Sequence, residues 1–160
     1  MKEEVRIKLR SIRYEVEASM FTDVEDERIP LDALEEEAEP EQIEINTLGI
    51  LEKADGRVQI SYEETQATGM EGSSTAVSFL EGDPGMVSMI REGAVSTALV
   101  FEAGKRHHCL YQTPFMPFEV CVYTKKVENR LLDEGYLELD YMIEIRGARA
   151  ERTQFRMELL

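Results

Sequence analysis

The sequence has few cysteines, few basic residues and no long apolar run, and each shortage excludes a class of protein. Two cysteines, Cys109 and Cys121, are too few for the disulfide framework of a small secreted domain. No apolar run approaches the roughly 20 residues of a membrane-spanning helix, and residues 1–4 (MKEE) do not begin a signal peptide. The sequence therefore predicts a soluble, cytoplasmic protein without membrane contact.

Basic residues are outnumbered: 18 lysines and arginines stand against 33 aspartates and glutamates, for a formal net charge of -15. Non-specific nucleic-acid binding needs clustered basic residues that neutralise phosphates, so we expect no nucleic-acid partner. An anionic membrane surface would repel the chain for the same reason. The 160 residues are 42% hydrophobic, which is enough for a sizeable core. We therefore expect one domain spanning residues 1–160.

The negative charge is concentrated in one segment. Residues 23–41 hold ten acidic residues and one basic residue, so the segment carries -9 of the total charge. Within it, residues 31–38 are good helix formers between two prolines, and they allow about two helical turns. Charge blocks of this kind are usually solvated connections. The alternative is an acidic lid or docking arm for a basic partner, and the sequence leaves both open.

Alternation of apolar and polar residues fills the rest of the chain, with turn residues between the runs. About ten such runs joined by short loops imply antiparallel strands, because parallel strands need crossovers of about a dozen residues. Closing the meander removes its edges. We therefore predict an all-β, antiparallel up-and-down barrel of about 8–10 strands, with the acidic segment inserted after the first strand.

Two local patterns refine this prediction. In the first run the apolar positions change from odd numbers in residues 5–9 to even numbers in residues 12–16, which predicts a β-bulge near residues 10–11. The pair Asp55 and Gly56 follows an alternating run, and this pair suits the positive φ angles of a tight hairpin turn.

Five blocks in order resemble a known protein family. They are ISYEET at residues 60–65, TGMEGSST at 68–75, IREGAVS at 90–96, FEAGKRH at 101–107 and YQTP at 111–114. Together they resemble the YwiB-like proteins, a bacterial family of unknown function, over residues 43–159. The resemblance implies a calycin-like (lipocalin-like) barrel and a cytoplasmic setting, and it implies no catalytic mechanism. The acidic segment is longer than the family pattern, and FMP at 115–117 replaces an aromatic residue followed by glycine.

Two charged residues fall on apolar strand faces. Glu64 follows the inward positions of residues 58–62, and Arg91 follows those of residues 87–89. Burying either charge alone would cost several kcal/mol, so we expect the two to pair as a plug at the barrel mouth if both point inward. The alternative is simple exposure of both residues at strand ends. In the functional alternative, Arg91 binds an anionic ligand inside the barrel, because a guanidinium recognises a carboxylate with two parallel hydrogen bonds. The candidate ligand-binding residues are Tyr62, Glu64, Arg91 and Tyr111.

Lys105 to His108 form the one local cationic cluster in the sequence. Because the cluster begins a strand, successive side chains alternate between faces and cannot all meet one ligand. His107 and His108 therefore project oppositely, and we expect a solvated strand start rather than a metal site.

Cys109 and Cys121 are equally spaced about Phe115 in a proline-containing turn. A symmetric hairpin would place them opposite each other on one face, where a disulfide or redox pair could form. In a cytoplasmic protein we expect two reduced, buried thiols instead.

No known catalytic motif is present: the sequence has no nucleophile elbow, no phosphate-binding glycine loop and no paired-cysteine zinc motif. We therefore expect neither an enzyme nor a cofactor or metal. The preferred hypothesis is a non-catalytic barrel that binds a small amphipathic or anionic ligand, because small barrels can hold one ligand. The alternative is a protein–protein adaptor that uses the acidic segment.

Overall fold

The structure is a computed structural model that describes residues 1–17, 40–65, 72–145 and 149–160. These residues form ten strands, and none belongs to a helix long and apolar enough to cross a membrane. The strands are β1 (Lys2–Glu17), β2 (Glu41–Ala54), β3 (Arg57–Glu63), β4 (Ser74–Leu80), β5 (Asp83–Glu92), β6 (Ser96–Glu102), β7 (Arg106–Gln112), β8 (Pro117–Arg130), β9 (Tyr136–Ile145) and β10 (Arg149–Leu159).

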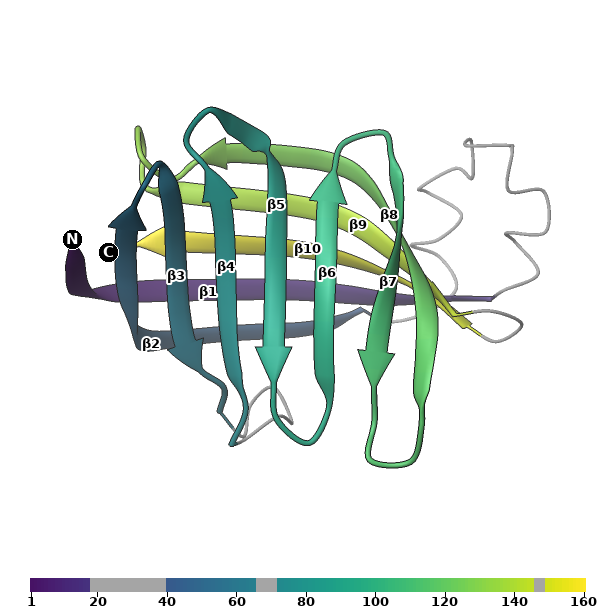
Figure 1. The fold of residues 1–160 in the computed structure, drawn as a ribbon. Coiled ribbons are helices and arrows are strands. Elements are labelled where there is room, and N and C mark those ends of the chain that lie inside the picture. The colour runs from purple at the N-terminus through teal and green to yellow at the C-terminus, as the bar shows by residue number, and fades with distance from the viewer. Residues whose placement is uncertain (18–39, 66–71, 146–148) are drawn as a thin grey trace.

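The strands close into one barrel in which each strand pairs with the next along the chain and β1 pairs with β10. Every pairing is antiparallel, which confirms the predicted up-and-down barrel. In Figure 1, β3 to β6 stand upright in front of β1, β9 and β10, which run across behind them. The predicted acidic insertion falls between β1 and β2, and residues 18–39 lie outside the described residues.

The hairpin predicted at Asp55 and Gly56 is confirmed. Both residues have positive φ angles, 52° and 77°, and they connect β2 to β3. Two consecutive positive φ angles match the twist of the flanking strands, and glycine reaches this conformation without steric cost.

The bulge predicted near residues 10–11 is wrong. β1 keeps one register with β10 from Ile7 to Glu17, and it also keeps one register with β2. Ser11 and Arg13 therefore continue the inner face that begins with Ile7, while the apolar Ile12 lies on the outer face beside Arg10. The apolar pattern changed in β1 because the inner face becomes polar there, and the register did not change. Register shifts occur instead in the β4–β5 and β8–β9 pairings.

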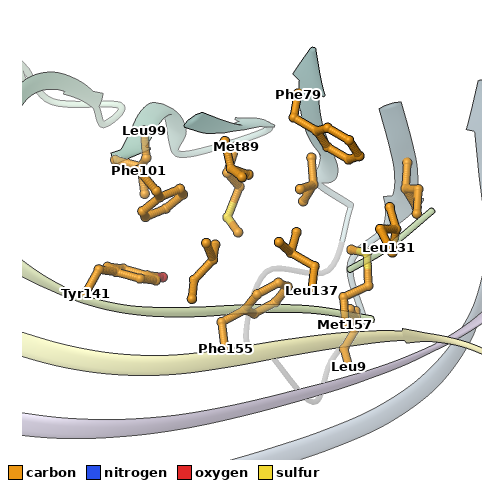
Figure 2. Packing of buried hydrophobic residues seen from close by; sticks show 14 of the residues in the cluster. Leu9, Phe79, Met89, Leu99, Phe101, Leu131, Leu137, Tyr141, Phe155 and Met157 are labelled. Atoms are coloured by element: carbon orange, nitrogen blue, oxygen red, sulfur yellow. The ribbon is translucent and has the colours of Figure 1, made fainter. Parts of the chain in front are cut away.

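Inward side chains of β3 to β6 stack in levels, because alternate residues of a strand share one face and neighbouring strands hold them in register. Two levels are apolar and buried, and we call them the apolar levels. They comprise Val58, Phe79, Val87 and Phe101, and then Ile60, Val77, Met89 and Leu99. Buried residues of the opposite wall, among them Leu137, Phe155 and Met157, pack against them (Figure 2). The Phe101 and Tyr141 rings lie with centroids 4.5 Å apart.

Candidate functional site

The next level along the same strands is polar. It takes one residue from each of β3 to β7, and cross-strand pairs join each residue to the next around the barrel. We call this row the polar level; its members are Tyr62, Thr75, Arg91, Thr97 and Tyr111. The period-two repeat that points apolar residues inward in the preceding levels also points these groups inward.

A cavity of about 320 Å³ lies against the polar level. All four residues selected from the sequence line it, namely Tyr62, Glu64, Arg91 and Tyr111. The structure therefore brings these side chains together, and their role in binding a ligand stays a prediction. Strands β1, β9 and β10 supply the opposite wall with Arg13, Tyr141, Glu151 and Thr153.

Glu64 and Arg91 both face the inside of the barrel and pair there, as predicted. Glu64 Oε1 lies 3.4 Å from Arg91 Nη2 and accepts a hydrogen bond of 2.6 Å from the Thr75 hydroxyl. Arg91 Nε also donates to Thr75 Oγ1 at 3.2 Å. Only 2% of the Glu64 side chain and 17% of the Arg91 side chain are exposed. The pair is thus a buried ion pair that shares one hydroxyl group.

The chain around Glu64 is held by close contacts between strand ends. Glu64 N donates to Ser73 O at 2.8 Å, which ties the end of β3 to the start of β4. Gly93 packs on Ser73 so tightly that a Cβ at position 93 would lie 2.0 Å from Ser73 Oγ. Only glycine fits this approach, and both residues belong to the blocks that carried the family resemblance.

A second ion pair stands on the opposite wall of the cavity. Arg13 Nε lies 2.9 Å from Glu151 Oε1, with the two residues on β1 and β10. The sequence reading missed both residues, because the expected bulge turned Arg13 outward. The available signal was the unbroken odd-numbered series from Ile7 to Arg13, and Glu151 has the same parity as the inward Thr153 and Phe155.

Two tyrosines of the cavity wall stay protonated over the physiological pH range. Burial is the main cause that raises the pKa of Tyr62, and the nearby Glu64 carboxylate raises it further. Burial likewise raises the pKa of Tyr141. A phenol that resists ionisation keeps its hydroxyl proton, so both side chains can donate hydrogen bonds to a ligand.

The cationic cluster lies outside the cavity wall and alternates between faces as predicted. Lys105 and His107 both reach Glu102, at 3.4 Å and 3.2 Å. The hydrogen bond from His107 is the main cause that lowers the pKa of Glu102. Arg106 lies over the Tyr123 ring, 4.6 Å from its centroid. Among the described residues, no group of three metal-binding side chains gathers here or elsewhere.

The two cysteines do not face each other. Cys109 pairs in register with Val120, and Cys121 pairs with His108, so the hairpin is offset by one residue from the symmetric arrangement. Because one residue of offset reverses the face, Cys109 joins the core and Cys121 projects from the opposite side. Both thiols are free, and burial raises the pKa of each.

Comparisons with known proteins support the fold. A family model described as a domain of unknown function, DUF1934, matches residues 32–157. The crystal structure of the YwiB protein from Bacillus subtilis matches with a TM-score of 0.62 and 21% identity, covering 98% of this chain and 93% of that chain. No curated protein matches the chain. The two matches confirm the resemblance to YwiB-like proteins, and at this identity the structural likeness shows the barrel alone.

Proposed function

The chain belongs to the DUF1934 family of domains of unknown function, and from this premise we propose that it is a non-catalytic barrel protein that binds a small amphipathic molecule. The observation that carries the proposal is the cavity of about 320 Å³ between the polar level and the opposite wall. Sites for small ligands are concave, largely preformed and about 300–1,000 Å³ in volume. The closed antiparallel barrel suits this role, because small closed barrels can hold one ligand.

The cavity wall combines apolar and polar side chains, as an amphipathic ligand requires. Leu9, Met89, Leu99 and Phe155 present apolar surface, whereas the two ion pairs and the tyrosines present polar groups. A ligand would place its tail against the apolar levels and its polar group against Glu64 and Arg91. The proposal includes no catalytic step, because each charged group of the wall is held by a partner of opposite charge.

A cavity-filling variant tests the proposal. Thr97→Phe places a large ring in the cavity, and the control Ala98→Phe adds the same ring at the next, exposed position of β6. We expect N-phenyl-1-naphthylamine to bind the unmodified chain and the control with increased fluorescence, and to lose binding in Thr97→Phe. Ser11→Phe fills the same cavity from β1 and should behave like Thr97→Phe. Unchanged fluorescence in both filled variants would refute binding in the cavity.

Native mass spectrometry of the protein purified from its own host extends this test. We expect a stoichiometric small molecule on the unmodified chain and on Ala98→Phe, and none on Thr97→Phe. We propose that the protein lies in the bacterial cytoplasm, where its two free thiols would stay reduced.

The second candidate function is a protein–protein adaptor. The acidic segment predicted to serve it lies almost wholly outside the described residues. A different surface favours an adaptor: the turn between β7 and β8, where Phe115 is 94% and Met116 64% exposed. The Thr113 hydroxyl accepts hydrogen bonds from the backbone N–H groups of both residues, which orders the turn. Exposed aromatic anchors of this kind dominate many protein interfaces. An adaptor predicts that Phe115→Ser abolishes capture of a specific protein from host extract while fluorophore binding stays unchanged, and equal capture by both chains contradicts it.

A further inference from the structure

We propose, on the premise that the cavity binds a small amphipathic molecule, that this molecule is an amine whose protonated nitrogen donates a hydrogen bond to Glu64. The expected ligand carries an ammonium group on an apolar tail, in place of the anion that Arg91 alone would favour. Three features support an amine: the acceptor atom of Glu64 that lacks a donor, the ion pair that already engages Arg91, and the tyrosines that line the cavity.

Glu64 has one acceptor atom in use and one that is empty. Its Oε1 receives hydrogen bonds from Thr75 and Arg91. Its Oε2 is buried, and no residue in the described part of the chain donates to it. A carboxylate oxygen that has lost water without gaining a donor raises the free energy of the folded state. An N–H donor on a ligand would remove this cost.

The empty acceptor belongs to a residue of the cavity wall. The last torsion of a glutamate side chain is broad and nearly two-fold. Rotation about this torsion would turn the open acceptor towards a bound ligand. The Thr97 hydroxyl, next to Arg91 in register, is also buried without a partner among the described residues. An ammonium group carries three donors, one of which could serve the open oxygen of Glu64.

Arg91, by contrast, already has a carboxylate partner. Its Nε and Nη2 donate to Thr75 and Glu64, so an anion would have to compete with a carboxylate that the barrel holds in place. The charged residues of the cavity wall are two arginines and two glutamates, whose formal charges cancel. The chain as a whole carries -15. A net negative field of this kind draws cations towards the protein and opposes anions.

The aromatic lining adds a second attraction for a cation. Tyr62, Tyr111 and Tyr141 all border the cavity. The face of an aromatic ring attracts a cation, and proteins combine several such rings with a carboxylate to recognise ammonium groups. Glu64 supplies the acceptor that an N–H donor needs, which favours a protonated primary or secondary amine over a quaternary one.

Three probes with the same tail test the inference on the unmodified full chain: octylammonium, octyltrimethylammonium and octanoate. Isothermal titration calorimetry should show octylammonium binding tightest. We expect an advantage of about tenfold over octyltrimethylammonium, which keeps the charge and lacks the N–H donor. Glu64→Gln should weaken octylammonium binding by about tenfold and should strengthen octanoate binding, because it removes the carboxylate that competes for Arg91. The matched control is Glu63→Gln, which alters the preceding, exposed glutamate and should have no effect.

Two results would overturn the inference and leave the proposed function standing. One is octanoate binding as tightly as octylammonium, or more tightly, to the unmodified chain. The other is an unchanged octylammonium affinity in a Glu64→Gln variant whose circular dichroism matches the unmodified chain. If none of the three probes binds, the inference also fails, and N-phenyl-1-naphthylamine binding then decides whether the proposed function stands. The comparison among probes needs no variant, so it decides the question even where a substitution prevents folding.

Discussion

The polar level lies two residues further along the same strands than the nearer apolar level, and the two differ in how they occupy the inside of the barrel. In the apolar levels, side chains such as Val58 and Phe101 meet across the barrel and fill it. In the polar level, Arg91 and its neighbours hold charges and hydroxyls inward and leave a cavity. One barrel architecture therefore produces both a packed core and a hollow, and the side chains at each level decide which forms.

The difference has an energetic side. Each fully buried apolar side chain contributes about 1.5–3 kcal/mol of transfer free energy. A buried ion pair often does no better than well-packed apolar residues of similar volume, because both charges lose their water. The apolar levels thus stabilise the folded state, whereas the polar level lowers its stability by burying charged groups that could bind a ligand. Four experiments test this difference between the apolar levels and the polar level.

Truncation in an apolar level should have the largest effect. Phe101 is fully buried and packs on Tyr141, so Phe101→Ala leaves a cavity as well as losing burial. We expect a loss of about 3–5 kcal/mol in the free energy of unfolding, measured by urea denaturation. Phe115→Ala, at an exposed turn, should change stability little. A loss below about 1 kcal/mol in Phe101→Ala would contradict the assignment of this level to the core.

Breaking the buried ion pair should come second. Arg91→Met removes the cation and leaves the Glu64 carboxylate buried beside one hydroxyl. We expect a loss of about 2 kcal/mol. Adding Glu64→Leu should recover more than half of that loss, because no uncompensated charge remains. If the double variant has a lower free energy of unfolding than Arg91→Met alone, the polar side chains stabilise the folded state, contrary to this prediction.

The tyrosines should make stability fall at alkaline pH. In the unfolded chain Tyr62 ionises near its usual pKa of about 10, whereas in the barrel its pKa is raised, chiefly by burial. The unfolded state then loses a proton that the folded state keeps. Stability is therefore complete below about pH 10 and decreases above it, by up to about 1.4 kcal/mol per pH unit for one tyrosine. Urea titrations from pH 9 to 11 should show a shallower decline in Tyr62→Phe. If stability declines equally steeply with pH in the unmodified chain and in Tyr62→Phe, ionisation of Tyr62 does not cause the decline.

Removing the Thr97 hydroxyl should have the smallest effect, and its sign is informative. The hydroxyl is buried and has no partner among the described residues, so Thr97→Val keeps the shape and removes an unsatisfied group. We expect a gain of about 1 kcal/mol in thermal or urea denaturation. Thr75→Val, which removes a hydroxyl that does bond Glu64, should lose stability instead. A loss in both variants would mean that Thr97 already has a bonding role.

Much of the barrel could be read from local patterns. In residues 136–145 the alternation of apolar and polar residues predicts that Leu137, Leu139 and Tyr141 point inward. All three are buried, although Met142 on the other face is buried as well. The same rule placed Glu64 and Arg91 on inner faces, where they pair. Local reading failed in β1, because it treated a change in polarity as a change in register. The predicted bulge therefore assigned Arg13 to the outer face of β1. No local pattern indicated its partner Glu151, which is far away in sequence.

The cysteines show the same limit at shorter range. Equal spacing about Phe115 suggested that Cys109 and Cys121 could face each other, but the turn adds one residue of offset and sends them to opposite faces. The geometry of a turn depends on backbone angles that the residue types near a proline do not determine uniquely. A pairing across even one hairpin therefore needed the structure.

The side chains that point inward on most strands could be predicted from the sequence alone, because alternation is a property of each strand. One hairpin could be predicted as well, from a residue pair suited to positive φ angles. The position of Arg13 and Glu151 opposite Glu64 and Arg91 across a cavity required the tertiary structure. That arrangement depends on barrel closure and on the registers of strands separated by more than a hundred residues. No local sequence pattern encodes the pairing of strands so far apart in the chain. That pairing places a second wall opposite the row of polar residues and so forms the candidate binding site.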